Sequence, residues 1–393
     1  MTTQQQAPMA QRSQEKIYFN HKDMDYYLSW VVGRQVFDGS DKQECLDVAA
    51  RITDGDPASW QREWLDLARR VEAGAQTAAE QGDTETARKA YLRACTYYRT
   101  PLFMMDPKDP NFREHGRMQQ ACFRAAMQYF LFSIEAIQVP YLGKILNGYA
   151  WQAGEDGQKR PTLLVVGGME TFAEDCYFMV GMAPLERGYN VITLDLPGQG
   201  MNPDQGLYLE AEMGPAVRTL IDYALSRPTV DPDRLVLFGF SWGGHIVLQG
   251  AVSEPRLKAL IANPPMPDVF KAGLAQQSGN GRGDPVNQLV FAQLAWRFGL
   301  QLTAIWARLV KAFQYLTHGK ADVKKILCPT LCMAGEGEAK ITLDLARQTY
   351  DQLPNPKKKL VIFTQAEGGE AHCQVNNLPL LNRVILDWLE TVL

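Results

Sequence analysis

The stretch LVLFGFSWGGHIVLQG, residues 235–250, sets a serine among glycines between two apolar segments. The first segment is typical of a buried strand, and the second has the apolar spacing of a helix. Gly239, Ser241 and Gly243 match the pattern G-x-S-x-G, which places a serine on the sharp turn from a strand into a helix. This serine is either part of a tight turn or a reactive nucleophile, and the rest of the chain decides between the two.

A serine on such a turn has its hydroxyl projecting beyond the end of the sheet. Gly239 and Gly243 carry no side chains, which would otherwise collide where the strand and the helix cross. The N–H of Trp242 begins the helix, so it would face negative charge that develops on a substrate. Phe240, inside the turn, is a further candidate for contact with a substrate.

A serine nucleophile needs a general base, and the chain has five histidines. His21 and His115 lie in a helical N-terminal region, and His318 ends an insertion. His245 lies four residues after the serine on the same helix, which favours a packed position. His372, in QAEGGEAHCQ, follows the last strand in a glycine-rich loop, where the chain order serine, acid, histidine requires the base. We therefore predict that His372 is the base rather than a surface histidine.

The acid that orients the base is expected after the preceding strand, in PTLCMAGEGEAK, residues 329–340. Glu336 and Glu338 both qualify. A spacing of three residues from Gly335, the glycine that ends the strand, selects Glu338, and Glu336 would then be a solvated turn residue. Asp195 is a competing carboxylate, but it follows an earlier strand and is better suited to ordering the turn LPGQG.

A tetrahedral intermediate needs a second backbone N–H, which the loop GGMETFAED, residues 167–175, would supply. Gly167 and Gly168 let the backbone approach a substrate, and the amide of Met169 or of Gly168 would donate. The same glycines fit a plain turn. An oxyanion hole is favoured because this loop, the serine turn, the acid loop and the histidine loop follow one another along the chain in the order that this catalytic arrangement requires.

The composition is that of a soluble globular protein without a nucleic-acid or membrane partner. The net charge is −4, so no surplus of basic residues would meet phosphates. The N-terminus lacks the apolar core of a signal peptide and no run of 18 or more apolar residues occurs, which predicts a cytoplasmic location. The cysteines of CPTLC, residues 328–332, have no second pair at metal-ligand spacing and are expected to pack in a strand. We therefore expect no metal and no cofactor.

Periodicity divides the chain into three parts. Residues 1–16 are polar and predict a flexible tail. Residues 17–137 have helical spacing and predict an all-helical cap domain. In residues 138–393 apolar strands alternate with helices, which predicts an α/β fold with a mostly parallel central sheet covered on both faces. An apolar insertion at about residues 266–322 would form a helical lid.

Two N-terminal helices carry clear start signals. DPASW begins with Asp56 as the expected N-cap and Pro57 at the first helical position, and DTETA restarts with Asp83 as a cap. Two helices joined in this way resemble a helical-repeat unit. No second copy follows at a fixed period, so we do not expect a solenoid.

Taken together, the motifs resemble an α/β-hydrolase. The likeness extends to the FrsA-like hydrolases with a helical N-terminal domain, a group that includes hydrolases of fungal heptaketide pigments and of 2,6-dihydroxypseudooxynicotine. The stretches that carry it run from about residue 17 onward and are DGDPASWQREW, ARKAYLRACTYYRT, VVGGMETFAED, LDLPGQG, GFSWGG, SEPRLKALIA, MAGEGE and GEAHCQ. The resemblance implies Ser241, Glu338 and His372 as a catalytic triad, a cap over the active site and a homodimer. Glu338 stands where many relatives have aspartate.

The resemblance further implies hydrolysis of a small carbonyl substrate, at a carbon–carbon bond of a β-diketone or polyketide-type compound or at an ester, in secondary metabolism or aromatic catabolism. Tyr98, Arg99 and Asp268 are candidates for contact with that substrate, and ordinary helix packing explains Tyr98 and Arg99 equally well. Two other functions stay open. A triad also serves acyl transfer, elimination or cyclisation, and the fold also serves as a silent binding scaffold, against which the complete triad and oxyanion loop argue.

Overall fold

The computed structural model describes residues 12–269, 284–300, 314–315 and 318–393. Most of the predicted tail lies outside these residues. So do three segments of the predicted insertion, namely residues 270–283, 301–313 and 316–317.

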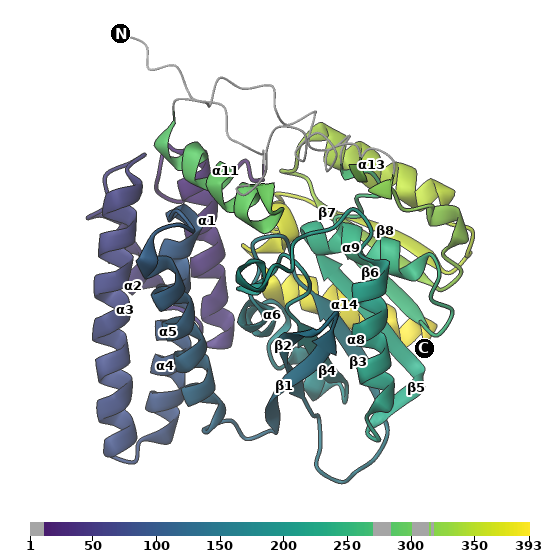
Figure 1. Cartoon of the computed structure of the whole chain (residues 1–393), viewed down its shortest axis with the longest axis horizontal. Coiled ribbons are helices and arrows are strands. Elements are labelled where there is room, and N and C mark those ends of the chain that lie inside the picture. The colour runs from purple at the N-terminus through teal and green to yellow at the C-terminus, as the bar shows by residue number, and fades with distance from the viewer. Residues whose placement is uncertain (1–11, 270–283, 301–313, 316–317) are drawn as a thin grey trace. The chain divides into compact units, whose positions relative to one another are not determined.

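The chain divides into two compact units, whose elements are labelled in Figure 1. The helical unit holds Met1–Leu131 and Gln276–Ala295, and the sheet unit holds Phe132–Ala275 and Trp296–Leu393. The predicted helical domain extends to residue 137, but the first strand already begins at Ile134. The apolar run FLFSIEAI continues the preceding helical pattern, so the periodicity alone did not mark the change from helix to strand.

Residues 12–131 of the helical unit form five α-helices and two 3₁₀ turns (Figure 1), which are α1 (Lys22–Gly33), the turn Arg34–Phe37, α2 (Lys42–Ala49), α3 (Pro57–Glu80), α4 (Thr84–Arg99), the turn Thr100–Met104 and α5 (Pro110–Met127). Asp56 caps α3 by accepting from the N–H groups of Ala58 and Ser59. Asp83 caps α4 by accepting from the N–H of Thr86. Both predicted caps are confirmed, and α4 packs against both α3 and α5.

Aromatic side chains fill the core of the helical unit. Trp60 and Trp64 are fully buried with ring centroids 5.7 Å apart, and the Trp60 indole N–H donates to the carbonyl oxygen of Thr100 at 3.1 Å. Tyr27 stacks on Phe103 with centroids 4.2 Å apart. Burial of each large apolar side chain contributes about 1.5–3 kcal/mol, so this cluster stabilises the packing of these helices.

The sheet unit is built on eight strands, which are β1 (Ile134–Tyr141), β2 (Lys144–Trp151), β3 (Arg160–Val166), β4 (Asn190–Leu194), β5 (Val230–Phe240), β6 (Ala259–Asn263), β7 (Thr330–Gly335) and β8 (Lys358–Phe363). Their order across the sheet is β1-β2-β4-β3-β5-β6-β7-β8. β2 is antiparallel to both of its neighbours, and the strands from β4 to β8 pair in parallel. The expected strand in the opening stretch is the end of β5, where Leu235–Phe238 are fully buried.

Helices cover both faces of the sheet, and they are α6 (Ala173–Val180), α7 (Ala183–Glu186), α8 (Gly214–Ser226), α9 (Trp242–Ala251), α13 (Lys340–Gln352) and α14 (Leu378–Val392). From β4 to β8 the chain crosses the sheet in one direction, and right-handed crossovers therefore place α8, α9 and α13 on one face. The step from β3 to β4 runs the other way, which puts α6 on the opposite face, where α14 packs on it. The predicted α/β architecture with a mostly parallel sheet is confirmed.

The described parts of the insertion and of the connections add short elements, namely α11 (Pro285–Arg297) and the 3₁₀ turns Asn202–Gln205, Val323–Lys325 and His372–Gln374. Cys328 and Cys332 of the CPTLC stretch are free thiols, and burial raises their pKa values to about 11 and about 12. Within the described ranges, no three His, Cys, Asp or Glu side chains cluster as metal ligands do. The helices in those ranges are all too short or too polar to cross a membrane.

Candidate active site

Ser241 lies between the end of β5 and the first residue of α9, with φ of 56° and ψ of −130°. A positive φ is strained for a residue that has a side chain, and it costs about 1–3 kcal/mol. Two glycines make the turn possible. An added Cβ at Gly239 would lie 2.2 Å from the carbonyl oxygen of Gly243, and one at Gly243 would lie 2.3 Å from that of Val166. The Ser241 N–H donates to the carbonyl oxygen of Asn263 at 2.6 Å, which ties the turn to β6.

Three predicted site residues form a chain of hydrogen bonds. The Oγ of Ser241 lies 2.9 Å from Nε2 of His372, and Nδ1 of His372 lies 2.9 Å from Oε1 of Glu338. A carboxylate only accepts, so in the neutral imidazole the proton lies on Nδ1, and Nε2 is left to accept the proton of the serine hydroxyl. Glu338 is buried and His372 is nearly so, which excludes most water from the pair.

Loops after β7 and β8 bring the acid and the histidine together. Glu338 follows β7, and its N–H donates back to the carbonyl oxygen of Gly335 at 3.1 Å. At Gly335 an added Cβ would lie 2.1 Å from the carbonyl oxygen of Glu370, two residues before His372. The glycine that ends β7 is therefore required because the histidine loop passes directly over it.

The competing carboxylates lie elsewhere. Glu336 is exposed, and its Oε2 accepts from the N–H of Gln365 at 2.9 Å. Asp195 is buried after β4, where burial and the nearby Glu174 and Asp175 raise its pKa well above the usual carboxyl value. The structure thus places Glu338, and neither of these two, against the histidine.

His245 occupies the packed position that the sequence indicates. It is fully buried, and its Nδ1 lies 2.7 Å from the carbonyl oxygen of Met266. Burial disfavours the imidazolium and lowers the pKa of His245 to about 4, so the ring is neutral at physiological pH.

The pKa of His372 is shifted in the opposite direction from that of His245. Burial alone would lower its pKa, but the neighbouring Cys373 and the Glu338 carboxylate together raise it to about 10. Glu338 therefore stabilises the protonated imidazole, the state that forms whenever Nε2 takes a proton from Ser241.

The loop after β3 passes beside the serine. At Gly168 an added Cβ would lie 2.7 Å from the Cβ and 3.0 Å from the Oγ of Ser241, so a side chain there has no room. Met169 follows Gly168 directly in the chain. Trp242 is the first residue of α9, so its N–H has no partner within the helix. Gly168 and Trp242 are thus next to Ser241, and donation by the Met169 and Trp242 amides stays a prediction.

Other candidate contact residues have partners within their own units. Phe240 is buried with its ring centroid 6.1 Å from that of Phe238. Asp268 forms an ion pair with Lys320, with Oδ2 and Nζ 3.3 Å apart. Neither observation shows a contact with substrate, so both remain predictions.

Tyr98 and Arg99 are buried among the helices of the helical unit. The Tyr98 hydroxyl donates to Oε2 of Glu72 at 2.6 Å, and the Arg99 guanidinium lies 4.1 Å from the ring centroid of Phe103. These contacts agree with the packing alternative for both residues.

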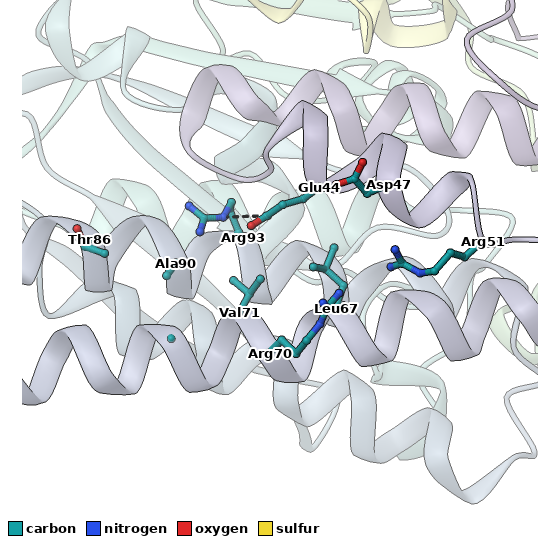
Figure 2. A pocket seen from close by; sticks show the side chains of 10 residues that line it. Glu44, Asp47, Arg51, Leu67, Arg70, Val71, Thr86, Ala90 and Arg93 are labelled. Atoms are coloured by element: carbon teal, nitrogen blue, oxygen red, sulfur yellow. Dashed lines mark ion pairs between the residues drawn. The ribbon is translucent and has the colours of Figure 1, made fainter.

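A groove of about 430 Å³ lies on the helical unit (Figure 2). The Nε of Arg93 and Oε2 of Glu44 pair within it at 3.2 Å. Its lining consists of Glu44, Asp47, Arg51, Leu67, Arg70, Val71, Gly74, Thr86, Ala90 and Arg93. The predicted site residues are not among them, so this groove is no part of the predicted chemistry.

Two buried residues that contact the loop after β3 were not predicted from the sequence. Gln199, in the LPGQG turn, donates from Nε2 to the carbonyl oxygens of Gly167 and Gly168. Arg297, the last residue of α11, donates to backbone carbonyls of the same loops. Both side chains are fully buried, yet glutamine and arginine are residue types that mostly lie at the surface, so the sequence gives no signal of their burial.

Comparison with known proteins shows the family and the fold. The family model described as esterase FrsA-like matches residues 21–278. The 20-hydroxy-prefusarin hydrolase FUS2 of Gibberella moniliformis is 29% identical over 92% of this chain and 94% of its own. The alpha/beta hydrolase psoB of Aspergillus fumigatus is 30% identical over 89% of each chain. The crystal structure of 2,6-dihydroxy-pseudo-oxynicotine hydrolase has a TM-score of 0.72 at 20% identity, covering 92% of this chain and 95% of that one.

The structural likeness confirms the α/β-hydrolase fold that the motifs predict. The relatives are hydrolases by name, which confirms the expectation that this chain is a hydrolytic enzyme. The family model covers well over half of the chain, including the serine turn and the oxyanion loop. The chain therefore belongs to the FrsA-like esterase family of α/β-hydrolases.

Proposed function

We propose that this protein hydrolyses a small carbonyl substrate by nucleophilic attack of Ser241. The observation that supports it most is the chain of hydrogen bonds from Ser241 through His372 to Glu338, with both links at 2.9 Å. Nucleophile, base and orienting acid then stand in the order that acyl chemistry needs.

In this mechanism Nε2 of His372 takes the proton of Ser241 as Oγ bonds to the substrate carbonyl carbon. The oxyanion that forms accepts from the amides of Met169 and Trp242. When the tetrahedral intermediate collapses, the bond to the leaving group breaks and His372 returns the proton to that group. Water, deprotonated by His372, then attacks the acyl-enzyme and releases a carboxylic acid with the serine restored.

We further propose a β-diketone or polyketide-type substrate, or an ester, from secondary metabolism or aromatic catabolism. A β-diketone suits this site because the carbon leaving group departs as an enolate, which the second carbonyl stabilises, before His372 protonates its carbon. Two names support the class: one relative is called a 20-hydroxy-prefusarin hydrolase, and one structural neighbour a 2,6-dihydroxy-pseudo-oxynicotine hydrolase. A cytoplasmic location and a homodimer also belong to this proposal, from the composition and the family resemblance.

Hydrolysis in ¹⁸O-labelled water tests the reaction type. With benzoylacetone or p-nitrophenyl butyrate as substrate, we expect one ¹⁸O atom in the released carboxylic acid, because water resolves the acyl-enzyme. An incubation without enzyme corrects for exchange at the ketone oxygens. Product without the label would reject hydrolysis and favour acyl transfer, elimination or cyclisation by the same triad.

Substitution of Gly168 by alanine tests the oxyanion loop. The new Cβ would lie 2.7 Å from the Cβ of Ser241, so either the loop or the serine turn has to move. Since a displacement of about 1 Å at reacting groups costs roughly 100-fold, we expect kcat for p-nitrophenyl butyrate to fall by about 100-fold or more.

The matched control for this variant is Gly74→Ala in α3. An added Cβ at Gly74 meets nothing within 4 Å, and alanine favours a helix, so activity stays at the wild-type level and the melting temperature is unchanged or higher. A Gly168→Ala enzyme with wild-type kcat would show that the loop does not lie against the nucleophile.

A further inference from the structure

The amide of Gln199 is the contact that fixes the oxyanion loop. Its Nε2 donates to the carbonyl oxygen of Gly167 at 2.5 Å and to that of Gly168 at 3.0 Å. Its Oε1 accepts from the N–H of Leu196 at 2.9 Å. The side chain is fully buried, so these three bonds form out of reach of competing water.

Only an amide of this length makes all three bonds. A carboxylate accepts from Leu196 but offers no donor to Gly167 or Gly168, and it would place negative charge against two carbonyl oxygens. A thioether of the same length makes none of the three. The group at position 199 is thus matched to its surroundings by its chemistry as well as by its size.

The geometry of the peptide bond links this contact to the reaction. In a planar trans peptide, the carbonyl oxygen of one residue and the N–H of the next point in opposite directions. The carbonyl of Gly168 belongs to the same peptide as the N–H of Met169, and the carbonyl of Gly167 to the same peptide as the N–H of Gly168. By holding both oxygens, Gln199 sets the direction of both candidate oxyanion donors.

Arg297 ties the two segments to each other. One terminal nitrogen donates to the carbonyl oxygens of Gly198 at 2.8 Å and Gly200 at 3.5 Å, on either side of Gln199. The other donates to the carbonyl oxygen of Glu170, in the oxyanion loop, at 3.2 Å. A second link joins the same segments, because the N–H of Gly200 donates to the carbonyl oxygen of Thr171 at 2.8 Å.

We propose that Gln199 is a positioning residue for the oxyanion hole, acting through the Gly167 and Gly168 peptides, and that Arg297 holds its turn against the oxyanion loop. The proposal rests on the proposed serine mechanism. It gives the LPGQG segment, whose sequence predicts only a turn, a role in the proposed reaction.

Replacing Gln199 with glutamate tests this role, because it keeps the acceptor for Leu196 and removes the donor to the two glycine carbonyls. With p-nitrophenyl butyrate we expect kcat to fall about 100-fold and KM to stay within about threefold, since the oxyanion exists only after attack. An alkyl trifluoromethyl ketone, whose adduct with the serine carries an oxyanion, should bind about 100-fold more weakly. The ascending limb of the pH profile is measured on Gln199→Met, which adds no charge, and it stays in place because His372 and Glu338 are untouched.

Gln205→Glu is the matched control. Gln205 lies six residues further along the chain, at the end of the 3₁₀ turn Asn202–Gln205, and its Nε2 donates to the carbonyl oxygen of Ile145 at 3.3 Å near the surface. This variant keeps wild-type kcat, KM and ketone affinity. If Gln199→Glu does not fold, Gln199→Met, which buries no charge, carries the same expectations for kcat and for ketone binding.

The possible results separate the two proposals. Loss of kcat and of ketone affinity in the Gln199 variants, with KM intact and the pH profile of Gln199→Met unchanged, supports the positioning role. A Gln199 variant with wild-type kcat, in a protein that Ser241→Ala inactivates, overturns this inference and leaves the serine mechanism standing. A Ser241→Ala protein that is still fully active rejects the mechanism itself.

Discussion

Ser241→Ala retains no more than about one part in 10⁴ of the wild-type kcat, and the loss reaches about 10⁶-fold if background catalysis is low. The reason is that the first step forms a bond to Oγ, and no other group in the His372–Glu338 chain replaces it. KM for p-nitrophenyl butyrate changes little, because the oxyanion loop and the substrate contacts are unchanged. Steady-state kinetics on the purified full chain measure both constants.

A fluorophosphonate probe supplies an independent readout for the same variant. The wild-type protein becomes labelled on the peptide that contains Ser241, and Ser241→Ala does not. Ser226→Ala is a suitable control, because Ser226 ends α8 and its hydroxyl is exposed and donates to the carbonyl oxygen of Tyr223. A protein that labels at another residue, or works without this hydroxyl, contradicts the assignment.

Glu338→Gln lowers kcat by about 10³- to 10⁴-fold, because the amide no longer stabilises the imidazolium and favours the wrong tautomer of His372. Glu336→Gln, two residues away and exposed, keeps activity within about twofold of wild type. Comparing these two variants decides whether Glu338 or Glu336 is the acid, an alternative that the sequence leaves open. An equal loss in both variants would count against Glu338.

The dependence of activity on pH shows in which direction Glu338 shifts the pKa of His372. The base works as neutral imidazole, and the pKa of His372 is raised, so wild-type kcat/KM increases with pH and its ascending limb is centred above the ordinary imidazole value of about 6.5. Glu338→Gln removes a group that favours the protonated ring, so the limb moves to lower pH. If the ascending limb of Glu338→Gln lies at the same pH as that of the wild type, the Glu338 carboxylate does not influence the pKa of the base.

The parts of the molecule that the sequence predicts are those fixed by local pattern and chain order. The serine turn shows as a strand, two glycines and a helix within sixteen residues of the opening stretch, residues 235–250. The histidine and the acid follow from the rule that loops at the carboxyl ends of parallel strands meet at one edge. Position 338 follows from its spacing to Gly335, and the structure shows why that glycine is needed, since the Glu370 backbone passes over it.

Contacts between polar side chains and distant backbone were not predictable in this way. Gln199 bonds to carbonyls about thirty residues earlier in the chain, and Arg297 to carbonyls about a hundred and more residues earlier. Hydrophobic periodicity contains no information about which buried donor meets which carbonyl. The partner of Tyr98 was not predictable for the same reason. Helical spacing shows that this side chain faces inward, but it does not show that Glu72 accepts its hydrogen bond.

The strained backbone at Ser241 also bears on how this sequence can change over time. Glycine adopts a φ of 56° without steric penalty, so a mutation to glycine at this position would relieve the strain and remove the proposed nucleophile in one step. Folding and catalysis therefore favour different residues at position 241. Selection for abundance alone would drive this protein toward a well-folded pseudoenzyme, and only selection on the reaction keeps a serine in the turn.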